Sequence, residues 1–319
     1  MGSVISIHSL TKRFGDRTAV SDLSFEVVPG VVTGFLGPNG SGKSTTMRMI
    51  MGLDTPTSGR ALVNGKPYAA LSWPLREVGA LLDAKAFHPA RTAYGHLRNL
   101  AYSNDISLSR VDEVLELVGL TDVARRRTGK FSLGMGQRLG IAGALLGDPG
   151  VLLFDEPVNG LDPEGIRWVR NLLRGLAAEG RSVFVSSHLI SEMGLTAERL
   201  VVIGKGTLIA DTTVRDFTES TGTESVRVVT PDSESFVAAV GKIGGRVEFA
   251  PDDSLEVRGL TSVAIGELVW NEHLVVHELT PVRASLEDAF MDLTRDAVEY
   301  RSGEGNSEAL IGSGQKGRS

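Results

Sequence analysis

The amino-acid sequence predicts an α/β fold with a mostly parallel sheet, followed by a smaller α+β unit. Apolar runs at residues 31–36, 151–154 and 181–186 have the length and composition of buried strands. A glycine-rich turn joins the first of these runs to an amphipathic helical stretch. Residues 225–279 are patterned as strand, helix, hairpin, helix and strand, which is the order of a split βαβ unit.

Composition limits the classes of protein to which the chain can belong. Its 319 residues suffice for one large and one small domain, and 41% hydrophobic and 23% charged residues are typical of a soluble protein. The net charge of −6 argues against a nucleic-acid partner, and the absence of cysteine excludes disulfides and thiolate chemistry. The first ten residues lack the layout of a signal peptide, and no apolar run approaches the ~18 residues of a membrane span. We therefore expect a chain that does not cross a bilayer by itself.

A strand and a further strand pair are expected before the strand that leads into the glycine-rich turn. Residues 4–10 alternate as a strand does, residues 11–16 have the composition of a turn, and residues 19–27 are patterned as a further strand pair. Phe14 stands among polar residues in the expected turn. An aromatic side chain at this place either packs against the protein or stacks on a nucleotide base, and its position alone leaves both open.

A phosphate-binding loop is predicted between the strand at residues 31–36 and the helix at residues 46–53. The intervening residues fill the pattern G-x-x-x-x-G-K-[ST]. They are Gly37, Pro38, Asn39, Gly40, Ser41, Gly42, Lys43, Ser44 and Thr45. The three glycines permit positive φ, so that backbone N–H groups turn toward a phosphate at the helix N-terminus. Lys43 is expected to reach the β- and γ-phosphates, and the Ser44 hydroxyl to bind Mg²⁺. A glycine-rich turn without a ligand is the alternative, which the flanking strand and helix disfavour.

Further elements follow the loop helix. Residues 60–64 and 76–82 are patterned as strands, and residues 108–118 as a helix. A helix from about residue 131 to residue 147 begins with Ser132 as its expected N-cap. Its glycines have the spacing G-x-G-x-x-x-G and no strand precedes them, so a dinucleotide-binding fingerprint is excluded. The start of this helix is instead expected to face an anion.

Three polar side chains follow the ends of buried strands. Asp155 and Glu156 follow the strand at residues 151–154, and His188 follows the strand at residues 181–186. Ligands of open α/β sheets bind at the carboxyl ends of parallel strands. Asp155 is expected to hold Mg²⁺, and Glu156 to polarise an attacking water. Solvated carboxylates and a satisfied polar histidine are the alternatives, which the shared sheet edge disfavours.

Together these motifs resemble the ATP-binding subunit of an ABC transporter. Residues 37–44 resemble the Walker A motif, residues 132–137 the signature, residues 151–156 Walker B, residues 159–162 the D-loop, and His188 the switch histidine. Five motifs in this order make the resemblance specific. It implies a P-loop NTPase cassette in which an antiparallel β subdomain and a helical subdomain flank the mostly parallel sheet.

The resemblance also implies roles for individual residues. The catalytic residues would be Glu156, His188 and Lys43, and Phe14 would stack on adenine. The signature residues expected to contact nucleotide are Ser132, Gly134 and Gln137. Two positions depart from the usual pattern: Leu133 replaces a signature glycine, and Asp83 stands in the Q-loop slot, where glutamine is usual and where we expect a contact with the metal ion.

Within the family, the signature and the Walker B segment look most like the daunorubicin and bacitracin resistance exporters. The implied function is ATP hydrolysis that drives multidrug or antibiotic export through a separate transmembrane permease, with ATP and Mg²⁺ as cofactors. The implied assembly is a two-fold, head-to-tail homodimer on the cytoplasmic side of the cell membrane. A soluble ABC ATPase that acts on DNA or the ribosome, and a regulatory ATP-binding protein without a permease, are the alternatives.

The chain divides into three parts by these patterns. Residues 1–220 are predicted to form the ATP-binding domain. Residues 221–297 are predicted to form an accessory α+β, ferredoxin-like domain, for which regulation or dimer contact is expected rather than catalysis. Residues 298–319 are rich in Ser, Gly and charge, and a disordered tail is predicted there.

Overall fold

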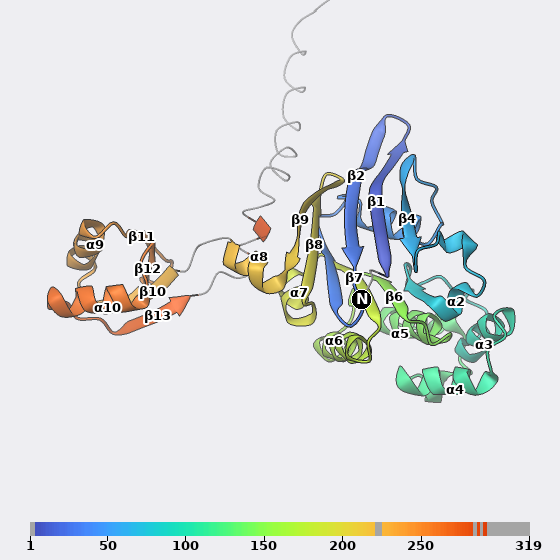
Figure 1. Ribbon diagram of the computed structural model, residues 1–319. Helices are drawn as coiled ribbons and strands as arrows, with labels where there is room; N and C mark the ends of the chain where they lie inside the picture. Colours follow the sequence, from blue (N-terminus) through green and yellow to red (C-terminus); the bar gives the residue numbers. More distant parts are fainter. Residues whose placement is uncertain (1–3, 221–224, 283–285, 288–289, 292–319) are drawn as a thin grey trace, which may run out of the picture.

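The computed structural model describes residues 4–220 and 225–282, together with residues 286, 287, 290 and 291. Within this described part the strands form three sheets, of six, three and four strands. Residues 4–220 form the first two sheets and residues 225–282 form the third. Figure 1 shows the third sheet and its helices set apart from the rest. The predicted tail at residues 298–319 lies outside the described residues.

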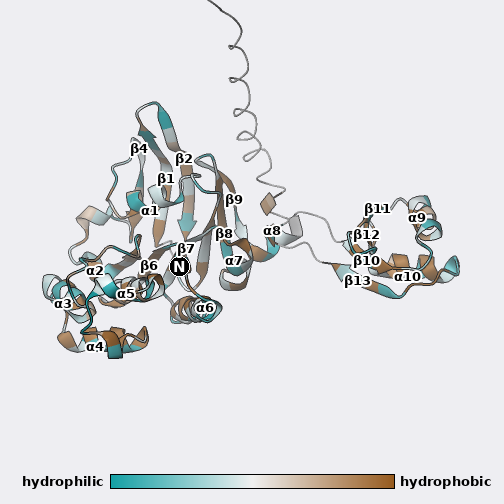
Figure 2. Ribbon diagram, turned by 180° about the vertical axis from the view of Figure 1, so that it is seen from behind, coloured by the Kyte–Doolittle hydropathy of each residue, from teal (hydrophilic) through white to brown (hydrophobic). Residues whose placement is uncertain are grey.

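The six-stranded sheet is the core of the larger part. Its strand order is β5-β6-β7-β3-β8-β9, in which neighbouring strands are parallel except for β9, which is antiparallel to β8. The strands are β3 (Val32–Leu36), β5 (Val78–Leu81), β6 (Val151–Asp155), β7 (Ser182–Ser187), β8 (Arg199–Gly204) and β9 (Thr207–Thr213). The central strands are buried on both faces, which is why they are apolar without alternation (Figure 2). The mostly parallel core predicted from the sequence is confirmed.

A three-stranded antiparallel sheet covers one side of this core. Its order is β2-β1-β4, formed by β1 (Ile5–Phe14), β2 (Arg17–Val27) and β4 (Ser58–Val63). Phe25 from β2 packs on Phe35 and Phe184 of the core strands, with ring centroids 5.0–5.6 Å apart in this trio. The three buried aromatic rings therefore join the two sheets.

Two expectations in this sheet were wrong. The expected turn at residues 11–16 is mostly strand, because β1 continues to Phe14 and pairs there with Arg17 across irregular register shifts. The expected strand pair at residues 19–27 is part of one continuous strand. The polar side chains on the solvent-facing side of β1 and β2 hid the full length of these two strands in the sequence pattern.

The helices of the larger part lie around the core sheet and in a subdomain beside it. They are α1 (Lys43–Ile50), α2 (Pro74–Glu77), α3 (Ala93–Ser103), α4 (Leu108–Leu117), α5 (Leu133–Leu145), α6 (Pro163–Ala178), α7 (Ile190–Thr196) and α8 (Val214–Ser220), with short 3₁₀ helices η1 (Tyr68–Ala70), η2 (Thr121–Val123) and η3 (Thr128–Lys130). α3 and α4 form the helical subdomain and pack on α5 (Figure 1). The strand expected at residues 76–82 begins only at Val78, because Pro74 starts a helical turn as its first residue. None of the helices in the described part of the chain has the length and hydropathy of a membrane span.

The smaller part has its own core and a ferredoxin-like topology. Its elements are β10 (Ser225–Val229), α9 (Ser233–Lys242), β11 (Arg246–Phe249), β12 (Leu255–Arg258), α10 (Ser262–Asn271) and β13 (Glu278–Val282). The antiparallel strand order β11-β12-β10-β13 is the one expected for a split βαβ unit. The last strand begins at Glu278, four residues later than the expected strand at residues 274–279.

Candidate nucleotide-binding site

The predicted phosphate loop joins β3 to α1. Gly42 is the N-cap residue of α1 with a φ of 109°, and Gly40 has a φ of 80°, so both occupy conformations that favour glycine. Gly37 is required for a different reason. It is not among the residues with positive φ, but a Cβ added there would lie 2.5 Å from both the Ile203 carbonyl oxygen and the Ser41 Oγ. The positive φ expected at Gly37 was therefore wrong, and close packing explains the residue.

The turn of the β8–β9 hairpin holds this loop from one side. The Gly206 N–H donates a hydrogen bond to the Ser41 carbonyl oxygen at 3.0 Å, and the Gly206 carbonyl oxygen accepts one from the Ser21 N–H at 2.8 Å. A Cβ at Gly206 would lie 2.7 Å from the Ala19 carbonyl oxygen. The hairpin turn therefore joins the loop to β2 through backbone hydrogen bonds.

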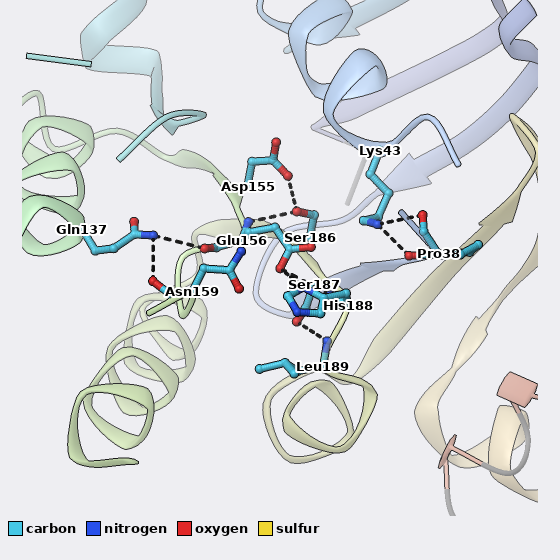
Figure 3. A network of polar contacts seen from close by, with 11 residues as sticks. Pro38, Lys43, Gln137, Asp155, Glu156, Asn159, Ser186, Ser187, His188 and Leu189 are labelled. Carbon is cyan, nitrogen blue, oxygen red and sulfur yellow. Dashed lines mark hydrogen bonds and ion pairs between the residues drawn. The ribbon is translucent and has the colours of Figure 1, made fainter. Parts of the chain in front are cut away.

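Lys43 is buried beneath the loop and folded back onto it. Its Nζ donates hydrogen bonds to the carbonyl oxygens of Gly37 at 2.6 Å and Pro38 at 3.3 Å (Figure 3). Burial lowers the pKa of Lys43, while the nearby carboxylates of Glu156 and Asp155 act in the opposite direction. An ammonium held by neutral carbonyl groups can exchange these partners for phosphate oxygens, as the sequence pattern predicts.

A solvent-open pocket lies against the loop. It is lined by Phe14, Arg17, Ala19, Asn39, Gly40, Gly42, Lys43, Ser44, Thr45 and Glu156. Phe14 is half exposed there, and the Lys12 Nζ lies 4.9 Å from its ring centroid. Arg17 and Ala19 were missed in the sequence analysis. Arg17 is paired with Phe14 between β1 and β2, so recognising this hairpin in the sequence would have pointed to Arg17 as a pocket residue.

The two carboxylates at the end of β6 are positioned by a serine on the next strand. The buried Ser186 hydroxyl donates a hydrogen bond to the Asp155 Oδ1 and accepts one from the Glu156 N–H at 3.0 Å (Figure 3). Glu156 has a φ of 51°, a left-handed conformation that is uncommon outside glycine. Sequence reasoning missed Ser186, because nothing in its own segment identifies its partners.

His188 and Glu156 are direct partners. The His188 Nδ1 lies 2.8 Å from the Glu156 Oε2, and the His188 N–H donates to the same oxygen at 3.4 Å. The structure therefore brings together Asp155, Glu156 and His188 at one sheet edge, as parallel strand order predicts (Figure 3).

Gln137 of the signature contacts backbone groups near the end of β6. Its side chain is buried, and its Nε2 donates to the carbonyl oxygens of Glu156 at 3.3 Å and Asn159 at 3.4 Å. Within this chain the amide braces the backbone of Glu156, and a contact of Gln137 with nucleotide stays a prediction. Asn159, on the D-loop, was likewise not singled out as a site residue.

Asp83 lies outside the pocket. Its side chain is exposed, and its Oδ1 accepts a hydrogen bond from the Lys85 N–H at 2.8 Å, so that it caps a turn. Asp83 is not part of the pocket lining. Among the described residues, no three His, Asp or Glu side chains are grouped around a common metal position. The expected metal contact of Asp83 therefore stays a prediction.

The signature residues lie away from the pocket. Ser132 is the N-cap of α5 as predicted, with its Oγ accepting a hydrogen bond from the Met135 N–H at 3.2 Å. Ser132 and Gly134 are both described, and neither lines the pocket. Leu133 is 44% exposed and packs against Gly160 of the D-loop. The phosphate loop and the signature of one chain therefore do not form a single site.

Comparison with known proteins assigns the family. A protein-family model described as "ABC transporter" matches residues 20–159. A second family model, described as a domain of unknown function, DUF8746, matches residues 224–287. The uncharacterized ABC transporter ATP-binding protein YhcH of Bacillus subtilis (strain 168) is 37% identical over 311 residues, which cover 94% of this chain and 98% of YhcH. The bacitracin transport ATP-binding protein BcrA of Bacillus licheniformis is 41% identical over 216 residues, which cover 66% of this chain and 70% of BcrA.

A solved structure gives the same assignment. The dimeric ATP-binding cassette MJ0796, in a post-hydrolysis state bound to ADP and Pi, matches with a TM-score of 0.61 and 25% identity, covering 66% of this chain and 99% of that chain. The chain therefore belongs to the ATP-binding proteins of the ABC transporter family, which bind ATP and hydrolyse it to power transport.

Proposed function

We propose that this protein is the ATP-hydrolysing subunit of an exporter and works as a homodimer with a separate membrane permease. The observation that carries the proposal is the composition of the pocket. It contains the phosphate loop, Phe14 and Glu156 of one chain but neither Ser132 nor Gly134. A second copy that places its signature over the pocket would complete the site. Two-fold symmetry then gives two sites from one interface.

Within each site the residues of the loop and the sheet edge have distinct roles. Lys43 and the loop N–H groups hold the phosphates, and Phe14 stacks on the base. Glu156 orients the attacking water, and His188, which lies 2.8 Å from its carboxylate, holds the γ-phosphate from another side. Ser132 and Gly134 of the second copy neutralise phosphate charge at the helix N-terminus. Catalysis is thus mainly positioning and charge stabilisation.

The donor set beside the pocket fits Mg²⁺. Ser44 lines the pocket, and Asp155 uses its Oδ1 for the Ser186 hydroxyl, which leaves Oδ2 for a cation. These hard oxygen atoms suit Mg²⁺, which is usually bound by one or two protein groups together with substrate phosphates and water. When bound there, Mg²⁺ would neutralise phosphate charge.

The relatives support an export role and a dimer. BcrA is named for bacitracin transport and SrtF of Streptococcus pyogenes for lantibiotic transport, and the latter is 34% identical over 208 residues. The MJ0796 structure is dimeric. The structure named cbiO1 is described as part of the complex cbiONQ. We infer an antibiotic-like or lipid-like cargo, a permease encoded apart from this chain, and a location on the cytoplasmic side of the membrane.

The test uses Glu156→Gln. This variant should bind ATP as the wild type does but hydrolyse it at least about a hundredfold more slowly, because the amide does not act as a base. Glu248→Gln, at an exposed site in the smaller part, is the matched control and should hydrolyse normally. The ATP-loaded Glu156→Gln protein is then used to capture partners from detergent-solubilised membranes of the source cell. Capture of a polytopic membrane protein supports the exporter, whereas ribosomal or other soluble partners alone would contradict it.

A further inference from the structure

The end of the described chain packs on the ATP-binding domain rather than on the smaller domain. Leu286 and Phe290 are only 8% and 6% exposed, and both belong to the core of the larger part, together with Met193 and Phe217. Neither belongs to the core of the smaller part. Both residues are helical in the structure, and they are four residues apart in the sequence. In Figure 1 a short red piece of this segment lies beside α8.

Leu286 contacts α7 at a glycine. A Cβ added at Gly194 would lie 3.2 Å from the Leu286 Cδ2 and 3.7 Å from its Cβ. Gly194 therefore allows the leucine side chain to lie directly on the helix backbone. Leu286 and Phe290 together are called the C-terminal buttress below.

α7 is held by three consecutive residues, each facing a different neighbour. Glu192 forms an ion pair with Arg170 of α6, with 2.6 Å between Oε2 and Nη2. Met193 packs on Gly34 of β3, where an added Cβ would lie 2.5 Å from its Sδ. Gly194 supports the buttress. The contacts of Glu192 and Met193 lie within the cassette. The contact of Gly194 is made by Leu286, which follows the smaller domain in the sequence.

α7 begins immediately after His188. Leu189 is its N-cap residue, and the Leu189 N–H donates to the Ser187 Oγ at 2.9 Å. His188 lies between these two residues and contacts the Glu156 Oε2 at 2.8 Å through its Nδ1. A shift of α7 along β3 would therefore be transmitted to the imidazole, since only one residue separates the two.

We propose that Leu286 and Phe290 are positioning residues for His188. Leu286 packs on α7 at Gly194, Phe290 is buried in the same core, and together they keep the imidazole beside Glu156. In the sequence α8 precedes the smaller domain and Leu286 follows it, and Phe217 of α8, Met193 of α7 and Leu286 belong to one core. The smaller domain is thereby coupled to the switch histidine. This inference rests on the proposed role of His188 in hydrolysis.

The test compares full-length Leu286→Ala and Phe290→Ala with wild type. We expect kcat for ATP to fall about tenfold and KM to change less than about twofold, because a displaced catalytic group affects turnover more than ground-state binding. In a variant that already carries His188→Ala, Leu286→Ala should change kcat by less than about twofold. The reason is that Leu286 affects turnover only by positioning His188. The deciding readout is NMR of the labelled histidine rings. The resonance lost in His188→Ala should shift in Leu286→Ala.

Two further variants separate positioning from loss of folding. Gly194→Ala favours helix formation but moves Leu286, and it should shift the His188 resonance without lowering thermal stability. Phe249→Ala removes an exposed phenyl group from the smaller domain and should leave the resonance and kcat unchanged. An unshifted His188 resonance in both Leu286→Ala and Gly194→Ala would overturn the inference. An unchanged kcat in His188→Ala would instead overturn the proposed role of His188, while the resonance shift would still report the coupling.

Discussion

Two serines on one strand provide a matched test of how the site is built. Ser182 and Ser186 both lie in β7 and are both buried, at 1% and 0% exposure. The Ser186 hydroxyl is bonded to Asp155 and to the Glu156 N–H. The Ser182 hydroxyl has no hydrogen-bond partner in the part of the chain that the structure describes. Replacing each by alanine removes the same atom from the same strand, so the difference reports the hydrogen bonds.

The expected magnitudes follow from these contacts. Ser186→Ala leaves a backbone N–H and a carboxylate oxygen short of a partner, which costs about 2–3 kcal/mol of unfolding free energy. For a domain of this size that corresponds to a fall in Tm of about 4–12 °C. Ser182→Ala removes a buried polar group without a partner and should be neutral or stabilising by about 1 kcal/mol.

The assay is thermal unfolding of the nucleotide-free proteins, followed by circular dichroism and calorimetry, together with steady-state ATP hydrolysis. Ser186→Ala should also lower kcat, because Asp155 and Glu156 lose the group that orients them. Equal changes in Tm for the two variants would refute the reasoning, since strand position alone would then explain the effect.

Three further perturbations test other parts of the structure. Burial lowers the pKa of His96, so the unfolded state binds more protons than the folded state, and the stability of the protein falls as the pH drops below 6.5. On acidification from pH 7 to pH 5, the Tm of His96→Gln should therefore fall less than the Tm of wild type. In chemical denaturation, Gly79→Ala should lower the free energy of unfolding by more than about 2 kcal/mol, because the new Cβ meets the Ala144 carbonyl oxygen. Gly175→Ala should raise it by about 0.5–1 kcal/mol, because the new Cβ lies in open space on a helix. Phe14→Ala should weaken ATP binding by about 1–3 kcal/mol in calorimetric titration, and an unchanged affinity would exclude stacking on the base.

The parts of the site that sequence reasoning predicted are those fixed by local pattern and strand order. The phosphate loop is one contiguous segment, so its backbone requirements are visible in its glycines. Asp155, Glu156 and His188 each follow an apolar strand, and parallel strands bring such positions to one edge of the sheet. The antiparallel pairing of β9 with β8 likewise has a local cause, since a short turn with Lys205 and Gly206 joins the two strands.

The missed parts depend on register and packing between distant segments. Ser186 meets Asp155 because the two are paired across β6 and β7, and a single sequence does not specify that register. Gln137 belongs to the signature by its position, but the packing of α5 turns its amide toward the backbone of Glu156. Phe14 was placed in a turn because the polar side chains of β1 hide its pairing with β2.

The backbone contacts between the hairpin turn and the phosphate loop have a thermodynamic consequence for ligand binding. Because backbone hydrogen bonds join Ser41 to Gly206 and Gly206 to Ser21, the loop is already ordered before a nucleotide binds. Ordering a flexible residue costs about 1–2 kcal/mol, and this cost is met during folding instead of during binding. Nucleotide association should then show a small heat-capacity change, near that of the contact surface alone. The rearrangement left for the ligand to induce within the loop is the transfer of Lys43 from carbonyl oxygens to phosphate.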